Sequence, residues 1–189
     1  MFFLLFVAVF VFITSVAVTL ARKRDKALKE LAANLNAKIP KFSFYPTLNG
    51  EHQGLKYTIS LFPGGKNTPP YLQAQLLKKS AFRLSVYRES ILSDFGKKLG
   101  LVHEVKVNDP AFDKDFLFFS NRQEQASTYL NNQTVKEAIQ GLFRAGFDSL
   151  TIDYQRVTVR RPDYSLEQDL SVENVKVLLQ RLAALAQGL

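Results

Sequence analysis

The first 21 residues contain no Asp, Glu, Lys or Arg, whereas the chain after them is strongly polar. A helix rises about 1.5 Å per residue, so about 20 apolar residues span a hydrocarbon core of roughly 30 Å. The pattern therefore predicts a transmembrane anchor over residues 1–21. Thr14, Ser15 and Thr19 interrupt the apolar run, but their hydroxyls can bond back to helix carbonyls.

A cleaved secretory signal is the main alternative interpretation of this segment. Such a signal has a basic start, an apolar core of about 7–15 residues and a cleavage site of the small-x-small type. The apolar run in this chain is longer, although residues 19–21 offer a weak cleavage site. A buried core helix is a third interpretation, but so small a chain has little else to cover it on all sides. We therefore favour an anchor that stays.

Four basic residues directly follow the apolar run, and they set the expected orientation. Lys and Arg next to a membrane helix stay on the cytoplasmic side, so we expect the N-terminus outside and the rest of the chain in the cytoplasm. The same cluster is a candidate contact with the anionic membrane surface. Its members are Arg22, Lys23, Arg24 and Lys26.

Residues 22–40 are predicted to form a basic juxtamembrane helix. Leu28, Leu31 and Leu35 recur at helical spacing, and Pro40 is incompatible with a helix interior. This segment is either a short stalk or a helix laid on the following domain.

The hydrophobic pattern changes to a period of two after Pro40, which predicts strands. An extended segment over 41–48 leads to Asn49-Gly50, a turn signal between strands. Four consecutive strands with short connections suggest an antiparallel meander. The segments of this meander are 41–48, 55–61, 71–78 and 82–86.

Later segments mix strands with helices. Two S/T-x-x-E/Q patterns, beginning at Ser120 and Thr134, predict two successive helices, and Ser171 caps a last amphipathic helix. The expected helices are 121–131, 135–144 and the segment after 171. The expected strands are 101–107, 116–119, 150–154 and 157–159. The segment 90–99 is expected to be a short helix or a loop. The fold class is therefore α+β, with an N-terminal transmembrane helix followed by a soluble domain over 41–189. That domain is a mostly antiparallel sheet with helices packed on one face.

Composition removes several classes of function. The chain has no Cys and two His, without the spacing of a zinc site, and we expect no metal and no cofactor. Its formal net charge of +8 is not gathered into a stripe, so no nucleic acid is expected. Residues 60–67 only partly match a phosphate loop, and no G-x-S-x-G elbow occurs. The sequence does not decide whether the protein is an enzyme, but it favours a non-catalytic protein.

Two polar clusters remain as candidate sites. The first is a turn motif over 108–116, whose carboxylates are grouped as in a cation site but lack the EF-hand pattern. We expect these carboxylates to bond local amides while the Phe side chain anchors the turn. The second cluster is a basic group on the last predicted hairpin, which is a possible contact for phosphate or a protein partner. The turn motif comprises Asp109, Phe112, Asp113 and Asp115, and the basic group comprises Arg156, Arg160 and Arg161.

Three stretches carry a resemblance: NDPAFDKDFLFFSN, ASTYLNNQTVKEAIQGL and FDSLTIDYQRVTV. They are similar to the soluble domain of bacterial membrane-anchored proteins of unknown function, in which D-P-x-F-D precedes a short strand, a helical pair and a strand pair. The similarity covers about residues 108–160. It implies a single-pass protein of the bacterial cytoplasmic membrane with an intracellular α+β domain, and it implies no catalytic residues.

The function expected from these observations is that of a non-catalytic accessory or scaffold subunit. Its partners would be the lipid bilayer and another membrane protein. A membrane-tethered enzyme or ligand sensor with a pocket in the α+β domain is the first alternative. A binder of anionic lipid surfaces through the juxtamembrane basic residues is the second alternative.

Overall fold

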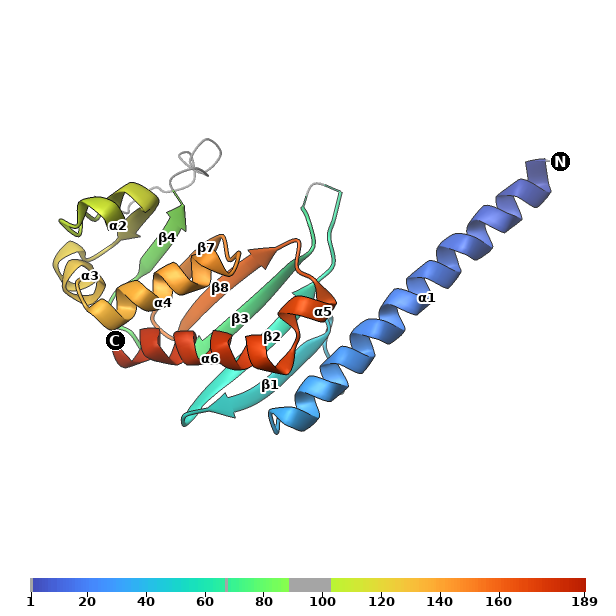
Figure 1. Cartoon of the computed structure of the whole chain (residues 1–189), viewed down its shortest axis with the longest axis horizontal. Helices are drawn as coiled ribbons and strands as arrows, with labels where there is room; N and C mark the ends of the chain where they lie inside the picture. The colour runs from blue at the N-terminus through green and yellow to red at the C-terminus, as the bar shows by residue number, and fades with distance from the viewer. Residues whose placement is uncertain (1, 67, 89–102) are drawn as a thin grey trace.

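A computed structural model describes residues 2–66, 68–88 and 103–189, without the side chains of residues 2–9, 13, 17 and 103. Its first element is α1 (Phe2–Asn34), a long helix that projects away from the rest of the molecule toward the N-terminus (Figure 1). The predicted apolar and juxtamembrane segments are parts of this one helix. Among the residues with described side chains, no helix combines the length and the apolar composition needed to cross a membrane. The anchor over 1–21 therefore stays a prediction.

The described residues after α1 form one α+β unit built on an eight-stranded sheet. The predicted α+β class and the antiparallel pairing of the sheet are confirmed, because helices accompany a sheet in which every strand pair is antiparallel. The strand order is β1-β2-β3-β8-β7-β4-β6-β5. The strands are β1 (Thr47–His52), β2 (Leu55–Phe62), β3 (Tyr71–Leu77), β4 (Leu84–Arg88), β5 (His103–Glu104), β6 (Phe116–Ser120), β7 (Ser149–Ile152) and β8 (Arg156–Pro162).

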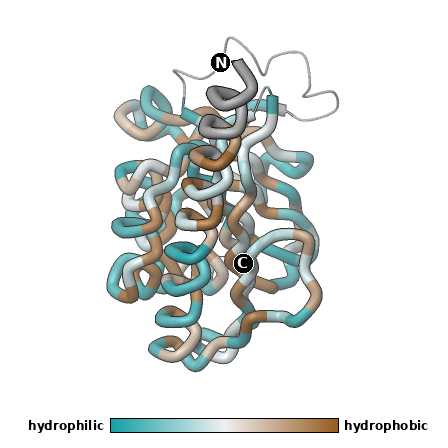
Figure 2. Tube along the Cα trace, turned by 90° about the vertical axis from the view of Figure 1, so that its right-hand side faces the viewer, coloured by the Kyte–Doolittle hydropathy of each residue, from teal (hydrophilic) through white to brown (hydrophobic). Residues whose placement is uncertain are grey.

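Helices α4 and α6 pack against each other over one face of this sheet (Figure 1). The alternation of each strand then becomes clear: Ile59, Leu72 and Val159 are buried toward these helices, whereas Thr58 and Gln73 on the other face are only half buried. Hydrophobic and hydrophilic segments accordingly alternate along the chain (Figure 2). The helices after α1 are α2 (Pro110–Asp115), α3 (Gln123–Leu130), α4 (Gln133–Arg144), α5 (Leu166–Asp169) and α6 (Val172–Gln187).

The predicted four-strand meander is wrong in its last step. Strands β1, β2 and β3 are neighbours, but β8 and β7 lie between β3 and β4. The register pairs Leu72 with Arg161 and Ala74 with Val159, which are far apart in sequence. Local alternation predicts that a segment is a strand, but it does not say which strand lies beside it.

The predicted turn at Asn49-Gly50 is also wrong, because both residues lie inside β1. The hairpin turns instead at Gln53 and Gly54, which have φ values of 51° and 77°, the left-handed pair that tight antiparallel hairpins require. Gly50 pairs with Tyr57 in the register. The tyrosine ring lies directly against the glycine, in the space that a Cβ would fill. Packing under Tyr57 therefore explains this glycine.

The C-terminal part of α1 is laid on the domain, which is one of the two arrangements that the sequence allowed. Leu28 and Leu31 are buried to 2% and 0% exposure within the common hydrophobic core, and α1 contacts β1, α5 and α6. Full burial of a leucine side chain is worth about 1.5–3 kcal/mol. These two residues therefore fix the direction of the helix relative to the domain.

We predict that Leu31→Ala lowers the free energy of unfolding by about 2–5 kcal/mol, because a fully buried leucine leaves a cavity when truncated. Urea unfolding of the full-length chain in mild detergent, followed by circular dichroism, measures this change. Leu77→Ala is the matched control, since Leu77 is 48% exposed, and it should change stability by less than about 0.5 kcal/mol. Equal small effects of both substitutions would show that α1 is not part of the core.

Candidate functional site

The turn motif folds as the short helix α2 and serves the core. Asp109 caps this helix, with its Oδ1 accepting a hydrogen bond from the Phe112 amide at 3.3 Å, and Pro110 begins it. Asp113 Oδ1 accepts a bond from the Val107 amide at 3.0 Å. Asp115 ends the helix on its exposed side. The carboxylates of Asp109 and Asp113 thus bond local amides.

Phe112 anchors α2 to the neighbouring elements. Its ring centroid lies 5.1 Å from those of Phe116 and Phe118, and Phe116 lies 5.0 Å from Phe143 of α4. Lys136 Nζ reaches from α4 to Asp109 Oδ2 at 2.7 Å. This hydrogen bond is the main reason that the pKa of Asp109 is lowered, with the Phe112 amide adding to it.

The three arginines of β8 do not form one site, because adjacent residues on a strand point to opposite faces. Arg156 and Arg160 lie on the face away from α4 and α6, and Arg161 lies beneath the helices. Each arginine has its own acidic partner. Arg156 Nε lies 3.5 Å from Asp153, and Arg160 Nη2 lies 2.8 Å from Asp148.

Arg160 occupies a shallow hollow of about 200 Å³ on the face away from α4 and α6, with Gln73 and Thr158 beside it. Its Nε also donates to Asp148 Oδ1 at 3.3 Å, which completes a forked contact. The hydrogen bond that Arg160 donates to Asp148 raises the pKa of the Arg160 guanidinium. The guanidinium carbon lies 5.6 Å from the centre of the Tyr71 ring, so this face combines a held charge with an aromatic surface.

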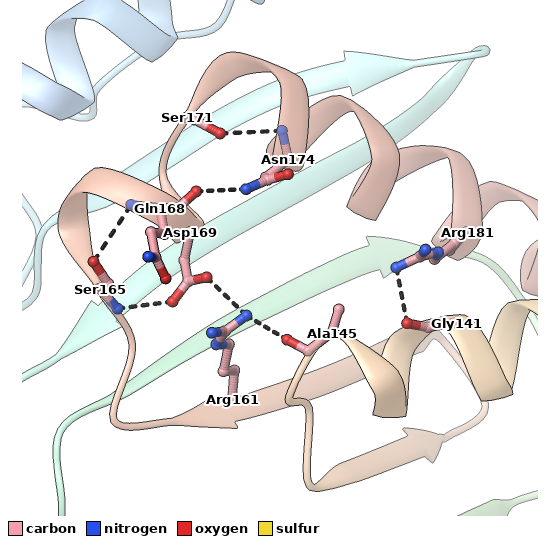
Figure 3. Close-up of polar contacts among 9 residues, drawn as sticks. All are labelled: Gly141, Ala145, Arg161, Ser165, Gln168, Asp169, Ser171, Asn174 and Arg181. Atoms are coloured by element: carbon pink, nitrogen blue, oxygen red, sulfur yellow. Dashed lines mark hydrogen bonds and ion pairs between the residues drawn. The ribbon is translucent and has the colours of Figure 1, made fainter.

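A second cleft, of about 370 Å³, lies between the ends of α4, α5 and α6. Figure 3 shows Arg161 reaching from β8 to both walls of it. Its Nη1 lies 2.7 Å from Asp169 Oδ1 and also donates to the carbonyl oxygen of Ala145 at the end of α4. Asp169 Oδ2 accepts a bond from the Ser165 amide at 2.7 Å. The Asp169 side chain is 7% exposed, so this ion pair is a buried structural connection.

A third wall of the cleft comes from α6 (Figure 3). Arg181 Nη1 donates to the Gly141 carbonyl oxygen at 2.8 Å, and Asn174 Nδ2 donates to the Gln168 carbonyl oxygen at 2.7 Å. A Cβ at Gly141 would lie 2.7 Å from Arg181 Nε. Gly141 therefore permits the close approach of the guanidinium to α4. In the described part of the chain, no carboxylate pairs with Arg181.

The arrangement in this cleft suits a small anionic or polar ligand. Arg181 and Asn174 both line the cleft, about two turns apart on α6, and Leu72, Phe147 and Leu178 supply apolar walls. Sequence analysis named Arg161 but missed Asp169, Asn174 and Arg181. The signal that was available was Gly141 within a helix, where glycine is unfavourable and often marks a close approach.

The basic residues after the apolar run all lie on α1. Arg22, Lys23 and Lys26 are exposed, and Arg24 is half buried. Lys23 Nζ lies 4.0 Å from the exposed Glu167 of α5, so α5 lies close to this part of α1. Within the described ranges, no group of three metal-ligating side chains occurs.

No protein-family model matches the chain, and no curated protein is significantly similar to it. Among solved structures, the fold is similar to the crystal structure of the mycobacterial trehalose monomycolate transport factor A, TtfA. The TM-score is 0.59 at 8% sequence identity, over 86% of this chain and 96% of that chain. At this identity the likeness shows a shared fold alone.

We predict that Asp169→Ala destabilises the protein by about 3–5 kcal/mol, because it leaves the Arg161 charge without its buried partner. Changing Arg161→Met in the same chain should recover part of this loss. Urea unfolding of the four combinations measures the coupling. Glu30→Ala is the control, since its exposed pair with Lys26 is worth about 0.3–0.5 kcal/mol. A double variant less stable than Asp169→Ala would contradict the account.

We predict that the contribution of Asp109 to stability depends on pH. A pKa lowered by folding stabilises the native state above the unfolded value, about 3.9 for Asp, and this stabilisation is lost as pH falls through the folded pKa. The urea midpoint of wild type should therefore exceed that of Asp109→Asn by more at pH 7 than at pH 3. Asp115→Asn, on the exposed end of α2, should show little change at either pH. If the urea midpoints of wild type and Asp109→Asn differ by the same amount at pH 7 and pH 3, the prediction is refuted.

Proposed function

We propose that this chain is a single-pass membrane protein of the bacterial cytoplasmic membrane that acts as a non-catalytic accessory subunit. In this proposal residues 1–21 span the bilayer, the N-terminus lies outside and the α+β domain lies in the cytoplasm. The domain would bind another membrane protein and hold it in a defined position.

The apolar sequence and the helix geometry support the anchor. The helix α1 runs without a break past residue 21. The polar groups within the apolar run are satisfied internally, as hydrocarbon requires: Ser15 Oγ donates to the Phe12 carbonyl at 2.8 Å, and Thr19 Oγ1 donates to the Ser15 carbonyl at 2.8 Å. The basic residues from Arg22 onward support the orientation, because such residues stay in the cytoplasm.

The observation that carries the proposal is the burial of Leu28 and Leu31 in the core of the domain. One continuous helix therefore connects the apolar run directly to a packed domain, without a linker between them. A ligand carrier or a free enzyme gains little from such a fixed attachment, whereas a subunit that must present one face to a membrane partner requires it. The fold neighbour TtfA is a trehalose monomycolate transport factor, and an accessory role of this chain is compatible with that description.

The face of the sheet away from α4 and α6 is the partner surface in this proposal. It is polar across its centre, with Thr58, Gln73 and Thr158 half buried, and Arg156 and Arg160 are set in it. Interfaces between separately stable proteins are about as polar as the rest of the protein surface, and Arg is enriched in them. Arg161 lies on the opposite face and belongs to the core connection with Asp169.

The cleft between α4, α5 and α6 favours a second candidate function, that of a membrane-tethered sensor. Arg181 and Asn174 would hold a small anion there, above the apolar wall of Phe147 and Leu178. After gentle extraction, a sensor would keep a small molecule bound, whereas an accessory subunit would keep a membrane-protein partner bound.

We predict that the full-length chain, purified from mild detergent through a C-terminal tag, retains Met1 and carries a stoichiometric membrane-protein partner. Mass spectrometry of the proteins, of the mature N-terminus and of released small molecules gives the result. Arg156→Ala combined with Arg160→Ala should lose the partner, because both side chains lie on the proposed contact face. Lys176→Ala, exposed on α6, should keep it.

Recovery of a lone chain would contradict the accessory role, and a stoichiometric small molecule released from that chain would favour the sensor. A mature end at Arg22 would contradict the anchor itself.

A further inference from the structure

The segment 39–46, which we name the aromatic loop, connects the end of α1 to β1 and exposes an unusual amount of apolar surface. Phe42 and Phe44 are 95% and 102% exposed, more than any other large hydrophobic residue in the described part of the chain. Ile39 and Tyr45 of the same loop are 41% and 42% exposed. A phenylalanine side chain is stabilised when it leaves water. Exposed apolar groups gathered on one loop mark an interaction surface.

The aromatic loop lies beside the part of α1 that leaves the predicted membrane span. A groove of about 400 Å³ is lined on one side by Arg24, Leu28 and Lys29 of α1 and on the other by residues that include Lys41 and Phe44. Arg24 follows Ala21 by three residues, which is about 5 Å along a helix. If residues 1–21 span the bilayer, as proposed above, the loop lies at the depth of the lipid headgroups.

The base of the aromatic loop is held in place by the sheet. Thr47 Oγ1 donates to the Tyr45 carbonyl at 2.9 Å, and the Leu61 amide donates to the Pro46 carbonyl at 2.9 Å. The Tyr45 ring lies 4.5 Å from Phe62, which stacks on Tyr71 at 4.5 Å. The two exposed phenylalanines are therefore presented by an anchored base and not by a free tail.

The charges around the aromatic loop are mainly positive. Lys38, Lys41 and Lys29 are exposed, and the nearby Asp25 lies 3.7 Å from Arg24. Lys and Arg near an anionic membrane surface are attracted to it. Tyr is enriched at the membrane–water interface, and Phe is among the apolar residues that surface-bound segments bury at the headgroup boundary. An anionic bilayer complements both properties of this surface, whereas a protein partner would leave the depth of the loop unexplained.

We propose that the aromatic loop is a second membrane contact, in which Phe42 and Phe44 insert into the headgroup region of an anionic bilayer. This inference rests on the proposed function, because it needs residues 1–21 to place the loop at the membrane surface. The two contacts, one span and one inserted loop, fix the tilt of the domain on the membrane. A single helix would leave that tilt free.

The chain contains no Trp, so a single introduced Trp reports its own environment. Full-length Phe44→Trp is reconstituted into vesicles of phosphatidylcholine and phosphatidylglycerol, with lipids brominated along the acyl chain as quenchers. Phe42→Trp is the second reporter. The matched control is Leu77→Trp, a position 48% exposed at the far end of β3 from Tyr71.

We expect bromolipid to quench Phe44→Trp and Phe42→Trp at least about twofold and to leave Leu77→Trp unchanged, because only an inserted ring reaches the acyl chains. Replacing phosphatidylglycerol by phosphatidylcholine should weaken the quenching. Both reporters behaving like Leu77→Trp, in chains that still float with the vesicles, would overturn the inserted loop and leave the anchor intact. A blue shift that depends on protein concentration without quenching would also overturn it, in favour of contact between copies of the chain. Chains that do not float with vesicles at all would overturn both the anchor and the loop.

Discussion

The packing of Leu28 and Leu31 against the sheet and α6 is the contact on which the arrangement of this molecule depends. These residues are 2% and 0% exposed, and the helix that bears them also bears the apolar run. A helix is stiff over the few turns that separate the apolar run from the buried leucines, so the position of the one sets the position of the other. The domain, the aromatic loop and the predicted span therefore act as one body.

Arginine side chains form ion pairs with aspartates on both faces of the sheet. Arg160 is fixed to Asp148, and Arg161 joins β8, α5 and the end of α4 through Asp169 and the Ala145 carbonyl. A buried pair contributes little net stability, but removing one partner is costly. The role of the Arg161 contact is thus to specify where α4 and α5 lie. Arg181 differs, because its bond to a neutral carbonyl leaves its charge available in the cleft.

Hydrophobic periodicity predicted the elements well and their contacts poorly. Strands β2 and β3 and helices α4 and α6 follow from alternation and helical spacing, since each buries one face. The order of the sheet did not follow, because the residues of β8 that pair with β3 lie 79 to 91 positions further along the chain. The two capping patterns located helices α3 and α4 but assigned the wrong capping residues. Ser120 bonds to the Arg83 carbonyl, and Asn132 caps α4 in place of Thr134. No local sequence motif around Arg181 marks it as a residue of the candidate cleft.

Amide hydrogen exchange of the full-length chain in lipid nanodiscs tests the central claim, that α1 and the domain form one body, most directly. Amides from Leu28 to Asn34 should exchange as slowly as those of β2, because they can open only when the core opens. Exchange in this segment at the rate of an isolated surface helix, with β2 still protected, would contradict the account. The domain would then hang from a flexible stalk.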